Sequence, residues 1–231
     1  MTAAAGSRAL LRTLAIVVLA TLLDASLLAI ALGGFPPLLQ HSRALALLAV
    51  WALGNLVITL ARPAMKPAES IQREPLPVVL GLFALPFLAG PLSAWGERTG
   101  IAVPALPIQV HGIAIALAAG GLALRAAAMA RLGRRFSHQV SLQTGHELET
   151  GGVYSRVRHP GYLGAWLAST GAALTFTSLL GLIPVALLIP ALAWRVGRED
   201  RMLEAQFGNS FRSWRARTGG LFPRLGPSRE G

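Results

Sequence analysis

The stretch "RHPGYLGAWLASTGAALTFTSLLGLIPVALLIPALAWR" (Arg158–Arg195) sets basic side chains at both ends of a long apolar run. The 35 residues from Pro160 to Trp194 include no Asp, Glu, Lys, Arg or His. A single helix of that length would measure about 52 Å at about 1.5 Å per residue, whereas the hydrocarbon core of a bilayer is about 30 Å thick. Two short membrane helices joined by a turn at Thr177–Pro184 fit better, and such a hairpin returns the chain to the side from which it started.

Four other apolar segments are long enough to cross a bilayer, for which about 20 residues are needed. They run from Leu11 to Leu32, from Ala44 to Leu60, from Leu76 to Trp95 and from Ile108 to Ala130. With the hairpin they make six spans. The sequence therefore predicts an all-α integral membrane protein of about six transmembrane helices with a C-terminal helical hairpin.

The composition supports a membrane protein and argues against several other classes. The chain is 53% hydrophobic and 13% charged, against about 25% charged residues in a typical soluble domain. The formal net charge is +11, but the basic residues lie between apolar spans, where anionic lipid headgroups explain them better than nucleic acid does. The absence of cysteine excludes disulfides and thiolate ligands. His138 and His146 lie eight apart with no cluster of ligands around them, so no metal site is expected.

The basic residues also orient the chain. With six spans, the connections on one side hold only Arg43 and Arg98, and the other 19 basic residues lie on the opposite side. The positive-inside rule then places both termini in the cytoplasm of a multi-pass cell-membrane protein. Two polar segments, 131–159 and 195–231, fall on that same side. Because a hairpin joins them, we expect them to meet at one cytoplasmic site.

The first of these segments ends on a helix N-terminus. Pro160 suits the first turn of a helix, whose free N–H groups and positive dipole end would lie at the membrane surface. Arg158 and His159 stand directly beside it, which favours an anion-binding site at the edge of the lipid. The alternative is that these residues simply follow the positive-inside rule.

The second segment offers an acidic partner. Arg195 and Glu199 are four residues apart and share a helix face. They are either an exposed ion pair worth at most about 1 kcal/mol or part of a functional cluster at the lipid boundary. Further on, Leu203, Phe207, Phe211 and Trp214 recur at helical spacing. This stripe indicates either a helix lying on the membrane surface or packing against the protein's own loops.

Two motifs in these segments resemble a known family. The stretches "GHELETGGVYSRVRHPGYLG" (Gly145–Gly164) and "RVGREDRMLEAQFGNSFRSW" (Arg195–Trp214) are similar to the C-terminal core of the integral membrane methyltransferases. That group includes isoprenylcysteine carboxyl methyltransferases and phospholipid N-methyltransferases. The similarity covers roughly Ala130 to Leu225, which divides the chain into N-terminal transmembrane helices (three spans, residues 1–105) and a methyltransferase core (residues 106–231).

The resemblance implies S-adenosylmethionine as the methyl donor and a lipophilic acceptor that enters from the bilayer. The acceptor would be an isoprenylcysteine-like carboxylate, a small prenyl or lipid compound, or the amine of a phospholipid. The resemblance assigns Arg195 and Glu199 to the acceptor's reactive group, as catalytic residues. It assigns the cofactor to His146, Leu148, Gly152, Tyr154, Arg158, His159, Pro160, Tyr162, Glu199 and Asp200. Asp200 departs from the family, in which glutamate is usual at that position.

The residue types suit this chemistry without the family. Methyl transfer from a sulfonium requires mainly positioning, an arginine–histidine pair at a helix N-terminus suits the donor's carboxylate, and Glu199 and Asp200 suit its cationic groups. Two other functions stay open. One is an NADPH-dependent membrane sterol-type reductase on a related fold. The other is a scaffold or transport protein, which would show paired half-helices or repeats.

Two charged residues inside the spans have no assigned role. Asp24 lies within the first span, where it either binds a substrate or ion or is a hydrogen-bonded structural carboxyl. Arg125 lies near the end of the fourth span. It either extends to the cytoplasmic surface or reaches the cofactor.

Overall fold

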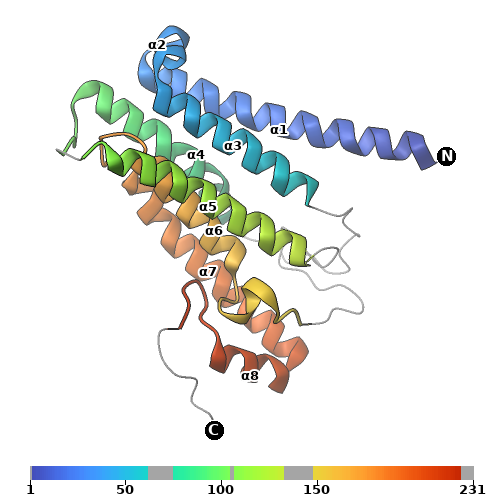
Figure 1. Ribbon diagram of the computed structural model, residues 1–231. Coiled ribbons are helices and arrows are strands. Elements are labelled where there is room, and N and C mark those ends of the chain that lie inside the picture. Colours follow the sequence, from blue (N-terminus) through green and yellow to red (C-terminus); the bar gives the residue numbers. More distant parts are fainter. Residues whose placement is uncertain (1, 62–74, 105–106, 133–147, 225–231) are drawn as a thin grey trace.

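The structure is a computed structural model that describes residues 2–61, 75–104, 107–132 and 148–224. The described chain is helical, and its one β-type contact is an isolated parallel bridge between Val157 and Gly219. Figure 1 shows the long helices side by side, with the last short helix set apart from them near the C-terminus. The helices are α1 (Thr2–Leu32), α2 (Phe35–Gln40), α3 (Ser42–Leu60), α4 (Leu76–Thr99), α5 (Gln109–Leu132), the 3-10 turn η2 (Gly152–Ser155), α6 (Pro160–Leu174), α7 (Leu182–Phe207) and α8 (Asn209–Arg217).

Four of these helices are long and apolar enough to cross a membrane: Leu14–Leu32, Ser42–Leu60, Leu76–Thr99 and Gln109–Leu132. They coincide with the first four predicted spans to within a few residues. Large apolar side chains lie exposed on their outer faces, among them Leu22, Ile30, Leu53 and Ile113. An apolar exterior of this kind suits lipid rather than water.

The uncharged stretch forms two helices, as its length requires. α6 has 15 residues and α7 has 26. The turn between them occupies residues 175–181, slightly before the predicted Thr177–Pro184. α7 does not end at Trp194 but continues without a break into the charged segment as far as Phe207. Neither helix is among those that are both long enough and apolar enough to count as membrane spans, since α6 is short and α7 carries charged residues from Arg195 onward. The total of six therefore remains a prediction.

The turn between α6 and α7 is held against the end of α4. The Ser93 hydroxyl donates to the Ser178 carbonyl at 2.8 Å and accepts from the Gly181 amide at 3.0 Å. A Cβ at Gly181 would lie 2.0 Å from the Ala89 carbonyl oxygen, so only glycine permits this approach. The contact fixes where the hairpin reverses.

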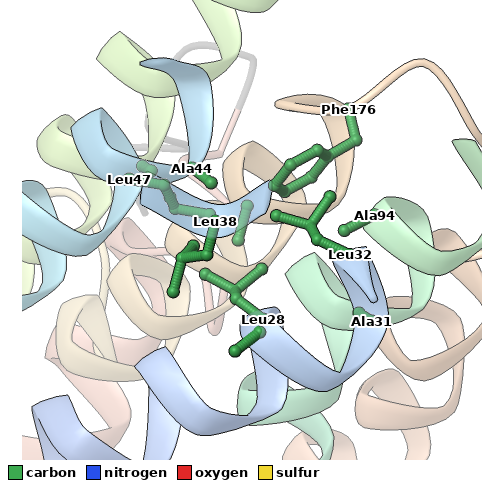
Figure 2. Packing of buried hydrophobic residues seen from close by; sticks show 11 residues of the cluster. Leu28, Ala31, Leu32, Leu38, Ala44, Leu47, Ala94 and Phe176 are labelled. Carbon is green, nitrogen blue, oxygen red and sulfur yellow. The ribbon is translucent and has the colours of Figure 1, made fainter. Parts of the chain in front are cut away.

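Glu97 ties the same turn to α3. Its carboxylate accepts from the Arg43 guanidinium at 2.7 Å, from the Thr177 amide at 2.6 Å and from the Thr177 hydroxyl at 2.8 Å. An apolar core lies beside Glu97, and in it Leu28, Leu47 and Phe176 are buried (Figure 2). Its residues come from α1 to α5, from the end of α6 and from the turn that follows α6. This end of the molecule is therefore fixed by one partly buried carboxylate and one apolar cluster.

α5 and α6 approach each other through small residues. A Cβ at Gly121 would lie 2.5 Å from both the Gly164 carbonyl oxygen and the Ala168 amide. A Cβ at Gly171 would lie 2.4 Å from the Ala118 amide and 2.5 Å from the Ala114 carbonyl oxygen. Such close backbone contact is the usual way in which membrane helices associate. It sets the position of α6, and with it the position of His159 at its start.

Gly171→Leu is expected to separate α5 from α6 and to destabilise the protein by at least about 1–3 kcal/mol, because the added side chain meets backbone that cannot move aside. The matched control is Gly120→Leu in α5, where a Cβ would meet no atom within 4 Å. Thermal unfolding of the two variants in detergent measures the difference. Equal midpoints would contradict close α5–α6 packing.

The apolar stripe near the C-terminus packs inward. Phe211 and Trp214 are 0% and 4% exposed and form a cluster with Ala128 and Tyr154. The stripe is also not one helix, because the chain breaks at Gly208, whose φ of +51° suits glycine. Of the two interpretations drawn from the sequence, packing against the protein's own elements is the one observed. The C-terminal surface helix is limited to α8, and its apolar side faces the protein.

Candidate functional site at the α6–α7 ends

The hairpin brings the start of α6 against the charged end of α7. His159 precedes α6, and its two ring nitrogens lie 2.8 Å from Asp200 Oδ1 and 3.2 Å from Glu199 Oε2. The imidazole is 6% exposed and stacks on the Tyr162 ring, with 5.7 Å between ring centres. A histidine flanked by two carboxylates donates from both nitrogens when it is protonated. The predicted meeting of the two polar segments is therefore present.

Arg158 lies on the other side of Asp200. Its guanidinium contacts both carboxylate oxygens, at 3.0 Å through Nη2 and 3.4 Å through Nε. This two-point geometry is the stronger form of an arginine–carboxylate pair. Asp200 is one methylene shorter than the family's usual glutamate, yet it reaches both Arg158 and His159. The substitution therefore keeps the carboxylate in contact with both cations.

A third chain segment completes this arrangement, and the sequence analysis missed it. Residues 218–220, directly after α8, pair with the junction: the Arg158 amide donates to the Gly219 carbonyl at 2.9 Å and the His159 amide to the Gly220 carbonyl at 3.1 Å. Arg158 Nη1 also donates to the Thr218 carbonyl at 2.6 Å. The adjacent glycines were the available signal, since paired glycines often mark close backbone approach.

Tyr162, Arg195 and Glu199 form a second group one turn away. Arg195 Nε donates to the Tyr162 hydroxyl at 2.5 Å and lies 3.4 Å from Glu199 Oε1, and the hydroxyl in turn donates to Glu199. The guanidinium also lies over the Tyr162 ring, 5.6 Å from its centre. The Arg195–Glu199 pair predicted from the four-residue spacing is therefore present. It is buried, with Arg195 5% exposed, and is not the exposed surface pair of the alternative interpretation.

The pKa values of this cluster follow from its contacts. Burial alone would lower the pKa of His159, but the hydrogen bonds to Asp200 and Glu199 outweigh it and raise that pKa. Burial alone would raise the pKa of Glu199 and of Asp200. Hydrogen bonds from His159, together with Tyr162 at Glu199 and Arg158 at Asp200, outweigh it and lower both. The charged forms thus stabilise one another, and with His159 protonated the cluster has three cations and two anions.

The raised pKa of His159 predicts how stability depends on pH. The group contributes fully below its ordinary pKa of 6.5, and this contribution is lost as the pH rises through the higher, folded-state pKa. We expect the free energy of unfolding to fall over that window, by at most about 1.4 kcal/mol per pH unit for one proton. His159→Asn should remove this dependence. Thermal unfolding of both proteins from pH 6 upward is the measurement, and parallel curves would contradict the assignment.

Other residues assigned to the cofactor lie elsewhere. Tyr154 is buried against α5 and α8: its hydroxyl donates to the Ala128 carbonyl at 3.3 Å, and its own carbonyl accepts from Trp214 Nε1 at 3.0 Å. Leu148 packs on the same cluster. Burial raises the pKa of the Tyr154 hydroxyl. These residues support the loop that carries Arg158, and the structure does not bring them into the His159 cluster.

Two further residues assigned to the cofactor, Gly152 and Pro160, shape the backbone of the loop and of α6. Gly152 has a φ of +56° and turns the chain beside the Arg131 guanidinium, and Pro160 is the buried first residue of α6. His146 lies outside the described residues. Arg125 donates from Nη1 to the Gly161 carbonyl at 2.9 Å, so it reaches the start of α6. Within the described residues no group of three or more His, Asp or Glu is placed to hold a metal ion.

The chain is similar to known methyltransferases in sequence and in fold. Residues 113–205 match the model of the isoprenylcysteine carboxyl methyltransferase (ICMT) family. A curated relative, protein-S-isoprenylcysteine O-methyltransferase from Schizosaccharomyces pombe, is 34% identical over 102 residues, which are 41% of this chain and 42% of that protein.

A solved structure also matches in fold. The eukaryotic intramembrane Ras methyltransferase ICMT aligns with a TM-score of 0.50 at 22% identity, over 77% of this chain and 64% of that one. The chain thus spans less than two thirds of either protein. The resemblance predicted from the sequence is confirmed: residues 113–205 are similar to isoprenylcysteine carboxyl methyltransferases, in a chain with several helices long and apolar enough to cross a membrane.

Proposed function

We propose, from the resemblance to isoprenylcysteine carboxyl methyltransferases, that this chain transfers a methyl group from S-adenosylmethionine to a lipophilic acceptor in the membrane. The acceptor is an isoprenylcysteine-like carboxylate or a small prenyl or lipid compound, with a phospholipid amine as the other choice. The observation that carries the proposal is the buried cluster in which Arg158 and His159 meet Arg195, Glu199 and Asp200. All five lie within the matched residues 113–205.

The chemistry of the cluster fits such a donor. Glu199 keeps acceptor capacity, since a carboxylate offers about four lone-pair sites and three of them face His159, Tyr162 and Arg195. It can therefore receive an amine or ribose hydroxyl. Arg158 and His159 are committed to Asp200, so their role is to hold that carboxylate and to keep the site electropositive for the donor's own carboxylate. When bound, the donor supplies an electrophilic methyl group.

The acceptor must be oriented by side chains of the protein, and Arg195 and Glu199 are the candidates. Arg195 is held rigidly by Tyr162 and Glu199 at the lipid-side end of the cluster. We assign it to the acceptor's carboxylate, which a guanidinium binds at two points. Glu199 is 21% exposed at its side chain and would accept the proton that an ammonium acceptor must lose before it is methylated. The burial of the cluster excludes water from the reacting atoms.

The decisive experiment uses purified protein, native lipid extract and radiolabelled S-adenosylmethionine, with the labelled product identified by mass spectrometry. We expect label in a lipid-soluble product. Calorimetry with S-adenosylhomocysteine and with NADPH on the same preparation tests the donor. Binding of NADPH alone would replace this proposal with the reductase.

Glu199→Gln separates the two acceptor classes. If the acceptor is an amine, the variant is expected to lose methylation by about 10²-fold or more, because no base remains. If the acceptor is a carboxylate, which needs no base, the loss is expected to be smaller and to appear mainly in KM. Initial rates with an S-prenylated cysteine and with a phospholipid amine give the comparison. If the variant lost the same activity whether the genuine acceptor proved to be an amine or a carboxylate, Glu199 would not be a base specific to amine acceptors.

We also propose that the site and both termini face the cytoplasm, that the cell membrane is the location, and that residues 106–231 form the catalytic core behind three N-terminal spans. The charge distribution supports this orientation. Because the chain contains no cysteine, single-cysteine variants at the exposed Ser155 and Thr99 can be labelled from one side of intact cells. On the proposed orientation, an impermeant reagent added outside the cells labels Thr99→Cys and not Ser155→Cys. The opposite result would show that the protein has the reverse orientation.

A further inference from the structure

Asp24 is a buried carboxyl that the proposed reaction does not use. It lies on α1, eight residues before the end of the helix at Leu32, and is 6% exposed. At about 1.5 Å per residue it is about 12 Å from that end, which is well inside a hydrocarbon core of about 30 Å. Within the described part of the chain, Asp24 Oδ2 has no hydrogen-bond partner. The hydrogen-bonded structural role considered from the sequence is therefore not fulfilled at this oxygen.

Asp24 lines a small cavity that encloses about 10 Å³ and is partly open to its surroundings. Helices α1, α3, α4 and α6 supply the walls, which besides Asp24 include Leu28, Leu47, Trp51, Phe87 and Ala172. Trp51 and Phe87 stack on each other, with 6.4 Å between ring centres. The cavity is thus apolar apart from the carboxyl and is walled in part by aromatic rings.

The carboxyl itself supplies both partners that a polar ligand needs. An unpaired carboxylate in such surroundings is strongly disfavoured, so Asp24 is present as the acid. Its O–H then donates a hydrogen bond and its C=O accepts one.

The cavity is separate from the His159 cluster. Ala172 in its wall is twelve residues along α6 from Pro160, which is about 18 Å at about 1.5 Å per residue. Asp24, Trp51 and Phe87 also precede the matched residues 113–205. A ligand here would not compete for the groups assigned to methyl transfer.

We propose that the Asp24 cavity binds the hydroxyl group of a lipid-soluble alcohol that enters from the bilayer. A hydroxyl both donates and accepts, which matches the O–H and the C=O of one acid carboxyl. The enclosed space of about 10 Å³ is close to the minimum that holds one water molecule, so the cavity takes the hydroxyl group alone. The rest of the molecule lies among the exposed apolar faces of the helices. A water molecule has the same hydrogen-bonding chemistry and is the competing occupant.

Labelling with dicyclohexylcarbodiimide tests the site. This apolar reagent adds to a protonated carboxyl: the carboxyl oxygen bonds to the central carbon, the proton passes to a nitrogen, and no group leaves. We expect a mass increase at Asp24 in the full-length protein in detergent. Glu97 is the internal control, because its carboxylate is ion-paired with Arg43 at 2.7 Å and should not react.

Protection of Asp24 from labelling distinguishes a bound alcohol from a bound water molecule. 1-Octanol is expected to slow labelling of Asp24 at least threefold in a saturable way, and n-octane at the same concentration is expected not to. A cooperative thermal unfolding transition in detergent, measured before labelling, shows that the protein is folded. Asp24→Asn should abolish the labelled peptide while keeping that transition.

Two outcomes would overturn the proposal. Absence of label at Asp24 in folded protein would show that the carboxyl is inaccessible from the lipid or ionised. Label that octanol and octane affect equally would show that the cavity holds water only. Neither result depends on whether the chain transfers methyl groups, so failure here and failure of the proposed function are distinguishable.

Discussion

Replacing Asp200 with alanine is expected to destabilise the protein by about 3–5 kcal/mol, because removal of one partner leaves buried charge uncompensated. Two cations depend on this carboxylate: Arg158 at 3.0 Å and His159 at 2.8 Å. The side chains of all three residues are 10% exposed or less. Arg158 also positions residues 218–220, so the variant should loosen the C-terminal segment as well. Thermal and denaturant unfolding in detergent, with S-adenosylhomocysteine binding as a second readout, give the result.

Glu204→Ala is the matched control for Asp200→Ala. Glu204 lies one turn further along α7 and also pairs with two cations, Arg212 and Arg215, but those arginine side chains are more than half exposed. Exposed ion pairs contribute about 0–1 kcal/mol, so this variant should unfold close to the unmodified protein. If the two variants had the same midpoint, the buried cluster would not be the stabilising element that its geometry indicates.

Arg195→Lys is expected to lower methyl transfer by about 10²–10³-fold, on the proposed function, while changing stability little. Lysine keeps the charge but loses the planar fork and the contact with the Tyr162 ring. The acceptor would then be held less accurately, and misplacement of about 1 Å costs on the order of 10²-fold in rate. Steady-state rates with the radiolabelled donor measure the effect, and donor binding by calorimetry shows whether the loss is confined to the acceptor side.

Arg198→Lys serves as the comparison for Arg195→Lys. Arg198 lies on the same helix, with its guanidinium 5.3 Å from the centre of the Trp194 ring, and has no role in the proposed reaction. Its replacement should leave the rate near that of the unmodified protein. Equal losses in the two variants would indicate a general effect of arginine on α7, and the assignment of Arg195 to the acceptor would fail.

The sequence alone determined the helical segments and the hairpin. The length of a segment without charged residues decides whether it can be buried in lipid. A 35-residue uncharged run is too long for one span, so the sequence predicts that the chain reverses near Thr177. That reversal in turn predicted that Arg158 and His159 would meet Glu199 and Asp200. Helical spacing predicted the Arg195–Glu199 pair. These inferences succeeded because they depend on chain length and on the helix repeat, which are local properties.

The partners within the cluster depend on tertiary packing. No sequence pattern places Tyr162 between Arg195 and Glu199, turns Tyr154 toward Ala128 and Trp214, or pairs residues 218–220 with the junction. These contacts join segments 33 to 60 residues apart, and they depend on how closely α5, α6 and α7 approach one another. Small residues such as Gly121 and Gly171 set that approach, and their effect becomes visible only when two helix faces are placed together.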